Sequence, residues 1–530
     1  MIFLGANQNK DYQQPCINVE NAVEMRGVTK TFGSVIANDN VDLDIRRGEI
    51  LSLLGENGSG KTTLMNMLSG IYYPDEGQVY VDGEAVTIRS PKDAIDLGIG
   101  MVHQHFKLVD VLTATENIIL GLKEPGRLNL KKAAEKITAI CDKYGFVVDP
   151  NKKIYDMSVS EKQTVEIVKV LYRGANILVL DEPTAVLTPQ ETEKLFNVIR
   201  NMKEDGKSII IITHKLHEVM AISDRVAVLR KGEHVADVDT EDTNPQELTD
   251  MMVGHQVRLN IERPEPKDRV KRLEIRNLSV NNIYGLKALD DVNFDVYGGE
   301  ILGIAGISGC GQKELLEAIA GLQQVEAGSS VLYYPDDAEE GRELLGMNPM
   351  DIKKAGIGFS FVPEDRLGMG LVGSAGMVDN MMLRSYRDGH SFFTDHKAPK
   401  KLAEEVKEQL EVVTPNINTP VRRLSGGNVQ KVLVGREIAA HPKVLMTAYA
   451  VRGLDINTSY TIYNLLTQQK TEGVAVMYVG EDLDVLLELC DRILVLCGGR
   501  VSGIVDARTT TKEEVGMLMT SLPQEEGEQQ

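Results

Sequence analysis

The chain has 530 residues, a length that favours several domains over a single small one. It carries 58 Lys and Arg against 78 Asp and Glu, and the net charge of −20 disfavours nucleic-acid binding, which needs clustered positive charge. Five scattered cysteines without a CxxC pair disfavour a disulfide framework and a zinc site. The apolar runs are of strand length and the start lacks the features of a signal peptide, so we expect a soluble or peripheral protein.

The two halves of the chain repeat one another. The segment ANDNVDLDIRRGEI from Ala37 is echoed by ALDDVNFDVYGGEI from Ala288, at an offset of 251 residues. The segment DRVAVLRKG from Asp224 is echoed by DRILVLCGG from Asp491, at an offset of 267 residues. Because this repeat is far longer than that of a solenoid, it indicates a duplicated domain.

The first motif that carries chemistry begins at the end of an apolar strand predicted at residues 50–55. The segment GENGSGKT, residues 55–62, matches the pattern G-x-x-x-x-G-K-[ST] and opens a predicted helix. Its glycines let successive N–H groups point at phosphate oxygens; Lys61 is expected to reach the β- and γ-phosphates, and the Thr62 hydroxyl to bind Mg²⁺. A glycine-rich turn without a ligand is the alternative. The predicted nucleotide-binding residues of this loop are Gly55, Glu56, Asn57, Gly58, Ser59, Gly60, Lys61, Thr62 and Thr63.

A second apolar strand ends in two carboxylates. In the segment NILVLDEP from Asn176, Asp181 is placed to hold Mg²⁺ and Glu182 to orient or activate the attacking water. A strand that ends in a solvated acidic turn is the alternative reading.

Three further motifs complete a family resemblance. Gln104 lies in MVHQHF, His214 lies in IIITHK, and the second half carries LSGGNVQ from Leu424. With the glycine loop and DEP, they resemble the nucleotide-binding domains of ATP-binding cassette (ABC) proteins. The resemblance implies an α/β fold of two tandem P-loop domains, each with an α-helical subdomain. We predict an N-terminal tail at residues 1–18, a first domain at 19–255, a linker at 256–270, a second domain at 271–521 and an acidic tail at 522–530.

The resemblance also implies roles for single residues. The two domains are expected to pair head to tail within the chain, with ATP between the P-loop of one and the LSGG signature of the other. Gln104 would contact Mg²⁺ and the attacking water, His214 the γ-phosphate, and Phe32 the adenine ring. Packing in the core is the alternative for Phe32 and His214. The predicted signature residues are Ser425, Gly426, Gly427 and Asn428.

The second copy departs from this pattern in an orderly way. Its loop has lost the lysine and the hydroxyl, its second strand has lost both carboxylates, and only its signature is intact, whereas the signature of the first copy has a serine in place of a glycine. All the losses fall in one of the two composite sites, so we expect one hydrolytic site per chain. The altered residues are Gln312, Lys313, Glu364, Ala448, Tyr449, Glu481 and, in the first copy, Ser160.

The resemblance narrows to one group of transporters. Two cassettes in one chain, the turn VPEDR at residues 362–366 and the segment RGLD at 452–455 resemble bacterial importers of simple sugars and nucleosides. The H-Q-H sequence around Gln104 and the loss of the second Asp-Glu pair favour the nucleoside type over the ribose or galactose type. The expected partners are integral membrane permeases, docked beside Gln104 and Glu364, and a separate substrate-binding protein, with ATP and Mg²⁺ as cofactors. We expect a peripheral location on the cytoplasmic face of the cell membrane, and no nucleic-acid partner.

Two other classes of protein are weighed against the importer. Some soluble tandem ABC proteins act on ribosomes or nucleic acid, but the predicted linker is short and mixed in charge, and the chain is acidic. A regulatory module that binds ATP without hydrolysing it is disfavoured by the complete motif set of the first copy.

Overall fold

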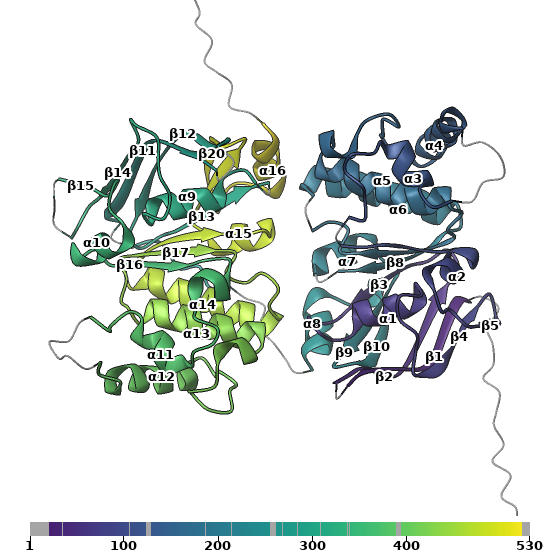
Figure 1. Ribbon diagram of the computed structural model, residues 1–530, viewed down its shortest axis with the longest axis horizontal. Helices are drawn as coiled ribbons and strands as arrows, with labels where there is room; N and C mark the ends of the chain where they lie inside the picture. Colours follow the sequence, from purple (N-terminus) through teal and green to yellow (C-terminus); the bar gives the residue numbers. More distant parts are fainter. Residues whose placement is uncertain are drawn as a thin grey trace, which may run out of the picture. The chain divides into compact units, whose positions relative to one another are not determined.

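The chain divides into two compact units, which Figure 1 shows in a computed structural model. One contains residues 1–185 and 195–255, and the other contains 186–194 and 256–530. Each unit has a four-stranded and a six-stranded sheet, as a duplicated α/β domain requires. The structure describes residues 21–33, 35–104, 106–122, 129–185, 187–213, 215–254, 261–267, 269–282, 285–307, 309–336, 338, 340–387 and 394–521.

The four-stranded sheet of the first unit is antiparallel, in the order β2-β1-β4-β5. In β2 the side chains of Val41, Leu43 and Ile45 are buried while their neighbours face outward, the alternation typical of a sheet with one covered face. Its strands are β1 (Asn21–Phe32), β2 (Val35–Arg46), β4 (Glu76–Val81) and β5 (Glu84–Val86).

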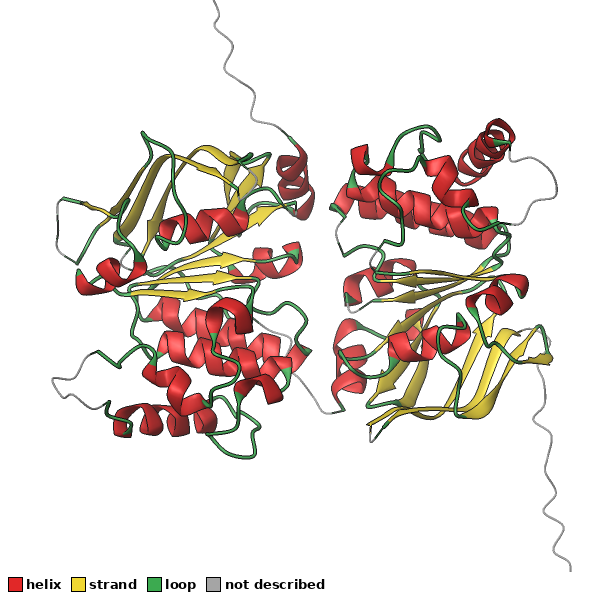
Figure 2. Ribbon diagram, in the orientation of Figure 1, coloured by secondary structure: helices red, strands yellow, loops and turns green. Residues whose placement is uncertain are grey.

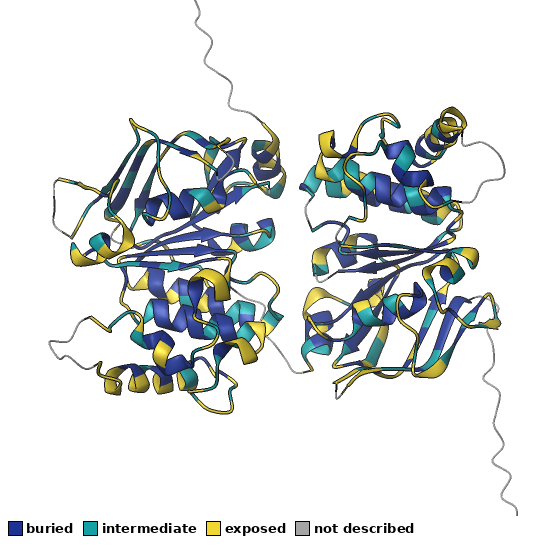
Figure 3. Cartoon of the chain, in the orientation of Figure 1, coloured by how far each residue is buried: buried dark blue, intermediate teal, exposed yellow. Residues whose placement is uncertain are grey.

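The six-stranded sheet of the first unit has the order β10-β9-β3-β8-β7-β6. All neighbours pair in parallel except β9 and β10. Three central strands are buried along their whole length, which explains their continuous apolar sequences (Figure 3). The strands are β3 (Ile50–Leu54), β6 (Ile99–Val102), β7 (Ile177–Asp181), β8 (Ser208–Ile212), β9 (Arg225–Arg230) and β10 (Glu233–Asp239).

Helices cover both faces of this six-stranded sheet. Helix α1 packs between the two sheets, while α3, α4 and α5 share a separate apolar core and form the helical subdomain (Figure 2). The helices are α1 (Lys61–Leu68), α2 (Pro91–Asp96), α3 (Ala114–Ile119), α4 (Leu130–Tyr144), η1 (Ile154–Asp156), α5 (Val159–Tyr172), α6 (Pro189–Glu204), α7 (Leu216–Ile222), η2 (Thr240–Asp242) and α8 (Pro245–Val253).

The second unit repeats both sheets. The antiparallel one has the order β12-β11-β14-β15, and the larger one has the order β16-β17-β18-β13-β19-β20. The strands are β11 (Lys271–Asn281), β12 (Lys287–Tyr297), β13 (Ile301–Gly306), β14 (Ser330–Tyr333), β15 (Arg342–Glu343), β16 (Phe359–Val362), β17 (Val444–Ala448), β18 (Ala475–Val479), β19 (Arg492–Cys497) and β20 (Arg500–Asp506).

Two apolar cores flank the larger sheet of the second unit. Helix α9 belongs to the core shared with the antiparallel sheet, and α11 to α14 belong to the other. The helices are α9 (Gln312–Ile319), α10 (Pro349–Lys354), the π-helical turn η3 (Arg366–Gly370), α11 (Met377–Met382), α12 (Lys397–Gln409), η4 (Val421–Arg423), α13 (Gly426–Ile438), α14 (Ile456–Thr471), α15 (Leu483–Leu489) and α16 (Lys512–Thr520).

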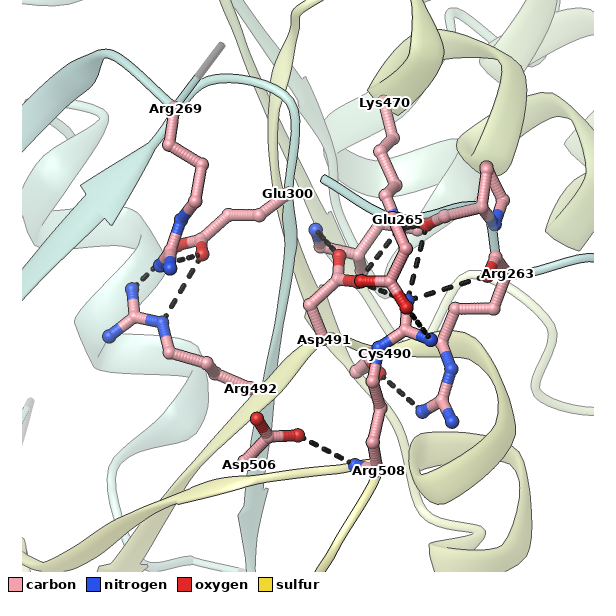
Figure 4. Close-up of polar contacts among 12 residues, drawn as sticks. Arg263, Glu265, Arg269, Glu300, Lys470, Cys490, Asp491, Arg492, Asp506 and Arg508 are labelled. Carbon is pink, nitrogen blue, oxygen red and sulfur yellow. Dashed lines mark hydrogen bonds and ion pairs between the residues drawn. The ribbon is translucent and has the colours of Figure 1, made fainter. Parts of the chain in front are cut away.

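Residues 261–267 of the predicted linker lie against the second unit (Figure 4). Ile261 is buried in its core. Arg263 donates from Nη1 to the carbonyl oxygen of Cys490 at 2.9 Å, and Lys470 donates to the carbonyl oxygen of Pro264 at 2.6 Å. This part of the linker is therefore fixed to the second unit, while the predicted domain boundaries themselves stay a prediction.

Segment 261–267 contacts an ion pair that is buried in the second unit. The equivalent ion pair of the first unit is exposed. Lys470 and Asp491 lie 2.7 Å apart with only 2% and 5% of their side chains exposed. Their counterparts, Lys203 and Asp224, lie 2.6 Å apart with 36% and 40% exposed. The repeat thus offers the same pair in two different environments.

We predict that Lys470→Met destabilises the second unit by about 3 kcal/mol, because it leaves a buried carboxylate without its main partner. The matched change Lys203→Met should cost no more than about 1 kcal/mol, since an exposed pair contributes little. Amide hydrogen exchange of β13 and of β3 measures the two units separately. Equal effects in both units would contradict the importance of burial here.

Candidate active site

The loop between β3 and α1 can be formed only by glycine at two positions. Gly60, which caps α1, has φ 98°, and a Cβ there would lie 2.3 Å from the carbonyl oxygen of Ala37. Gly55 has φ 153°, and a Cβ there would lie 2.3 Å from the carbonyl oxygen of Leu229. The backbone therefore curls around the start of α1 without any side chain at these points.

Lys61 points back into this loop. Its Nζ donates to the carbonyl oxygens of Gly55 at 2.7 Å and Glu56 at 2.9 Å, and the residue is 8% exposed. Burial lowers the pKa of Lys61, and the neighbouring carboxylates of Glu182 and Asp181 oppose that shift. An ammonium group is thus held inside the loop with acidic groups close by.

Asp181 ends β7 at the same edge of the sheet as the loop that follows β3. Burial, followed by the charge of Glu182, raises the pKa of Asp181 to about 6, while Lys61 and a hydrogen bond with Thr62 oppose the rise. The carboxyl ends of parallel strands meet at one edge, which is why residues so far apart in sequence become neighbours.

Glu182 and Gln104 form a second contact at this edge. The Nε2 of Gln104 donates to Oε2 of Glu182 at 2.8 Å. Glu182 has φ 47°, in the left-handed region, and its N–H donates to the carbonyl oxygen of Ile212 in β8 at 2.8 Å. The strained backbone is held by the sheet and points the carboxylate toward Gln104.

The remaining predicted residues of the first unit lie as follows. Phe32 is 44% exposed and its ring centroid lies 5.2 Å from that of Tyr72, so the alternative that it is core is wrong, while adenine stacking stays a prediction. Ser59 is buried, and its Oγ has no hydrogen-bond partner within the described residues. His214 lies outside the described residues. Asn57, Gly58 and Thr63 complete the loop and the start of α1.

The signature helix of the first unit has a carboxylate in its first turn, Glu161, which is paired with Lys152 at 2.7 Å. Ser158 caps α5 by accepting from the N–H of Glu161 at 3.2 Å, and the Glu161 carboxylate accepts from the N–H of Ser158 at 2.7 Å. The Ser160 hydroxyl lies 3.1 Å from that of Ser158. These capping contacts stabilise the helix and already use two of the N–H groups at its N-terminus. We missed Glu161 in the sequence, although the S-x-x-E pattern was a signal for it.

The signature of the second unit has a side-chain amide where the first has a carboxylate. Ser425 caps α13 by accepting from the N–H of Asn428 at 3.4 Å and from its side-chain amide at 2.8 Å. The Asn428 side-chain oxygen accepts from the N–H of Val413 at 2.8 Å. A Cβ on Gly427 would lie 3.2 Å from a carboxylate oxygen of Asp455. Asn428 thus stands where the first unit has Glu161, and the Asp455 carboxylate lies close to Gly427.

The loop of the second unit keeps its backbone and loses its charge. Gly311 has φ 98°, as Gly60 has. Gln312, 3% exposed, donates from Nε2 to the carbonyl oxygen of Ile307 at 3.1 Å, and so takes the place of the Lys61 ammonium with a neutral group. The Lys313 side chain is 53% exposed and lies 3.8 Å from Glu317, outside the loop.

The end of β17 in the second unit likewise keeps the backbone conformation of the first unit but carries different side chains. Ala448 ends β17. Tyr449 has φ 50°, and its N–H donates to the carbonyl oxygen of Val479 at 3.0 Å, so its backbone has the same conformation and the same kind of contact as that of Glu182. Burial is the main cause that raises the pKa of Tyr449 to about 12, so the phenol is neutral at physiological pH.

An ion-pair network occupies the positions of Gln104 and His214 in the second unit. Arg452 contacts Glu364 at 2.6 Å and Glu481 at 3.1 Å. Arg452 therefore offsets the charge of both carboxylates. The sequence signal was the arginine of RGLD, which we did not connect with either carboxylate.

Comparison with known proteins agrees with this architecture. Residues 38–185 and 289–447 match the ABC transporter family. The chain belongs to the ABC transporter family. It therefore contains two tandem ATP-binding cassettes of an ATPase, and the predicted family and fold are confirmed. Below, the first and second units are called the first and second cassettes.

Three relatives match nearly the full chain. The nucleoside import ATP-binding protein NupA of Lactococcus lactis subsp. cremoris is 43% identical, over 94% of this chain and 98% of its own. The guanosine import ATP-binding protein NupO of Bacillus subtilis is 42% identical, over 96% and 99%. The ribose import ATP-binding protein RbsA 1 of Streptomyces avermitilis is 38% identical, over 96% and 95%. In the part of the chain that the structure describes, no helix is long and apolar enough to cross a membrane.

We predict that Asp181→Asn stabilises the first cassette when nucleotide and magnesium are absent. The folded chain holds the pKa of Asp181 at about 6, against an ordinary value of 3.8, so the ionised carboxyl destabilises the fold fully above pH 6. The gain should be about 1–3 kcal/mol at pH 8 and should vanish as the pH falls below about 4.

Denaturant unfolding at several pH values measures this effect, with exchange of β7 amides to assign it to the first cassette. Asp142→Asn, at an exposed position of α4, is the control and should leave stability unchanged at every pH. A destabilising Asp181→Asn change at pH 8 would contradict the prediction.

Proposed function

We propose that this chain hydrolyses ATP in one of its two cassettes to energise an importer of nucleosides. The observation that carries the proposal is the cluster of Lys61, Asp181, Glu182 and Gln104 at one sheet edge of the first cassette. The second cassette has Gln312, Ala448, Tyr449 and Glu364 in their place.

Lys61 and the loop amides would bind the β- and γ-phosphates. The Lys61 ammonium group donates to two carbonyl oxygens of the loop, and phosphate oxygens would replace these acceptors when a nucleotide binds. Phe32, exposed at the end of β1, would stack on adenine. In the head-to-tail pairing that the resemblance implies, Ser425 and the first N–H groups of α13 would supply the remaining phosphate contacts.

The residues beside Lys61 fit a magnesium ion. The Thr62 hydroxyl, the Asp181 carboxylate and the Gln104 side-chain amide offer the oxygen donors that Mg²⁺ prefers, and Asp181 is buried without a full counter-charge. Bound there, Mg²⁺ would neutralise charge that develops on the phosphates.

Glu182 would orient and activate the attacking water. Its carboxylate is held by the strained backbone and by Gln104, and it needs no rearrangement to face the loop. Gln104 would couple this carboxylate to the magnesium site and to a membrane partner, and His214 would contact the γ-phosphate. Tyr449, at the equivalent position of the second cassette, is neutral and cannot act as a base.

The substrate and the partners are proposed from the relatives and the motifs. NupA and NupO, both named for nucleoside-type substrates, are 43% and 42% identical to this chain, whereas the ribose relative is 38% identical. The H-Q-H sequence and the loss of the second Asp-Glu pair point the same way. The partners would be integral membrane permeases and a separate substrate-binding protein, with this chain on the cytoplasmic face of the membrane.

Uptake of labelled guanosine and ribose by cells that contain the complete transporter tests the function. We expect guanosine uptake that Lys61→Ala reduces at least a hundredfold, because both ATP binding and charge stabilisation depend on the ammonium. Gln312→Ala, the matched change in the second cassette, should keep uptake within about threefold of the wild type.

Three results would contradict the proposal in different ways. Ribose uptake without guanosine uptake would move the chain to the alternative sugar branch. Normal uptake by Lys61→Ala, or an equal loss in Gln312→Ala, would mean that the hydrolytic site is assigned to the wrong cassette.

A further inference from the structure

The VPEDR turn that follows β16 has a rigid backbone. Asp365 accepts from the N–H groups of Leu367 at 3.2 Å and Gly368 at 2.7 Å, and so fixes the start of the π-helical turn η3. At the other end of η3, the carbonyl oxygen of Gly370 accepts from the buried Arg436 of α13 at 2.7 Å. Arg366, the first residue of η3, therefore extends from a backbone that is fastened at both ends.

The side chain of Arg366 lies beside the signature helix of its own cassette. Its Nη2 donates to the carbonyl oxygen of Arg452, in the RGLD segment. Its Nη1 lies 3.2 Å from the position that a Cβ on Gly426 would occupy, and Gly426 is the first residue of α13. The two motifs that the proposed mechanism leaves unused, VPEDR and RGLD, thus meet at the N-terminus of α13.

The guanidinium of Arg366 has no carboxylate partner within the described residues, although it is partly buried. Arg452 contrasts with it, because that guanidinium contacts both Glu364 and Glu481. Burial lowers the pKa of Arg366. A cation and the positive end of a helix therefore lie side by side, an arrangement that favours an anion. The Asp455 carboxylate near Gly427 is itself bonded to the N–H and the hydroxyl of Thr458.

We propose that Arg366 is a phosphate-binding residue of the second cassette's signature. Its guanidinium would bind the terminal phosphate of ATP together with the Ser425 hydroxyl and the first N–H groups of α13. This inference rests on the proposed function, which assigns the signature to phosphate binding, and it adds a charged group that the signature motif itself lacks. A Cβ on Gly426 would lie 3.2 Å from Nη1 of Arg366, so a side chain there would require the guanidinium to shift slightly.

The first cassette keeps the capping serine, Ser158, but lacks the arginine and the glycine of this arrangement. Alignment of Gln104 with Glu364 places Phe106 opposite Arg366, and the repeat places Val159 opposite Gly426. Its signature helix carries the Glu161 carboxylate where the second cassette has Asn428. The second signature therefore has a guanidinium beside it, whereas at the first the Glu161 carboxylate, paired with Lys152, already occupies the helix N-terminus. This difference agrees with the proposal that only one of them receives the phosphate of a hydrolysed ATP.

The experiment compares Arg366→Gln and Arg366→Lys in the full chain purified with its permeases. Glutamine keeps an N–H donor for the carbonyl oxygen of Arg452 but removes the charge, and lysine keeps the charge. Arg342→Gln is the matched control, because Arg342 is exposed on β15 and has no carboxylate partner among the described residues. KM and kcat for ATP are measured, with the equilibrium affinities for ATP and ADP.

We expect Arg366→Gln to raise KM for ATP about tenfold and to leave the affinity for ADP unchanged, because ADP lacks the phosphate that the signature contacts. Arg366→Lys should recover most of the ATP affinity. A KM no different from that of Arg342→Gln, or equal losses of ATP and ADP affinity, would overturn the inference. Failure of the proposed function is separate: the wild-type complex and Lys61→Ala would then hydrolyse ATP equally.

Discussion

The site of the first cassette depends on one buried ammonium group. Lys61 is enclosed by carbonyl oxygens of its own loop and faces the carboxylates of Asp181 and Glu182. Burial disfavours the charged forms of Lys61 and of Asp181. The attraction between these two opposite charges offsets part of the desolvation cost of each. The cluster is therefore electrostatically costly without a ligand and suited to bind a nucleotide with its metal, which is the usual cost of a binding site.

The two cassettes share the backbone conformation of the site but differ in the side chains that it carries. Gly60 and Gly311 share φ 98°, and Glu182 and Tyr449 share a left-handed backbone held by the next strand. The second cassette keeps these conformations although its side chains no longer serve hydrolysis. The sheet edge fixes the backbone, so the loss of charged side chains leaves the fold intact, and Arg452 compensates the carboxylates that replaced Gln104 and His214.

Much of the fold and of the first site could be predicted because it follows from short stretches of sequence. Continuous apolar runs indicated β3 and β7, and the spacing of glycines indicated the loop, because consecutive residues determine that geometry. Contacts between distant segments could not be predicted. Arg452 and Arg366 acquire their roles only when a turn after β16 meets a loop after β17, and Glu161 went unnoticed beside the signature motif. The same limit applies to residues 261–267, whose anchoring depends on Lys470 and Cys490.

The central claim is that one cassette hydrolyses ATP and the other does not, and a paired substitution at the equivalent strand ends tests it most directly. ATP hydrolysis by the chain purified with its permeases is compared for Glu182→Gln and Tyr449→Phe, which change equivalent positions by a minimal amount. The account predicts that Glu182→Gln reduces kcat at least a hundredfold while Tyr449→Phe stays within about twofold of the wild type. Wild-type activity in Glu182→Gln, or an equal loss in both variants, would contradict it.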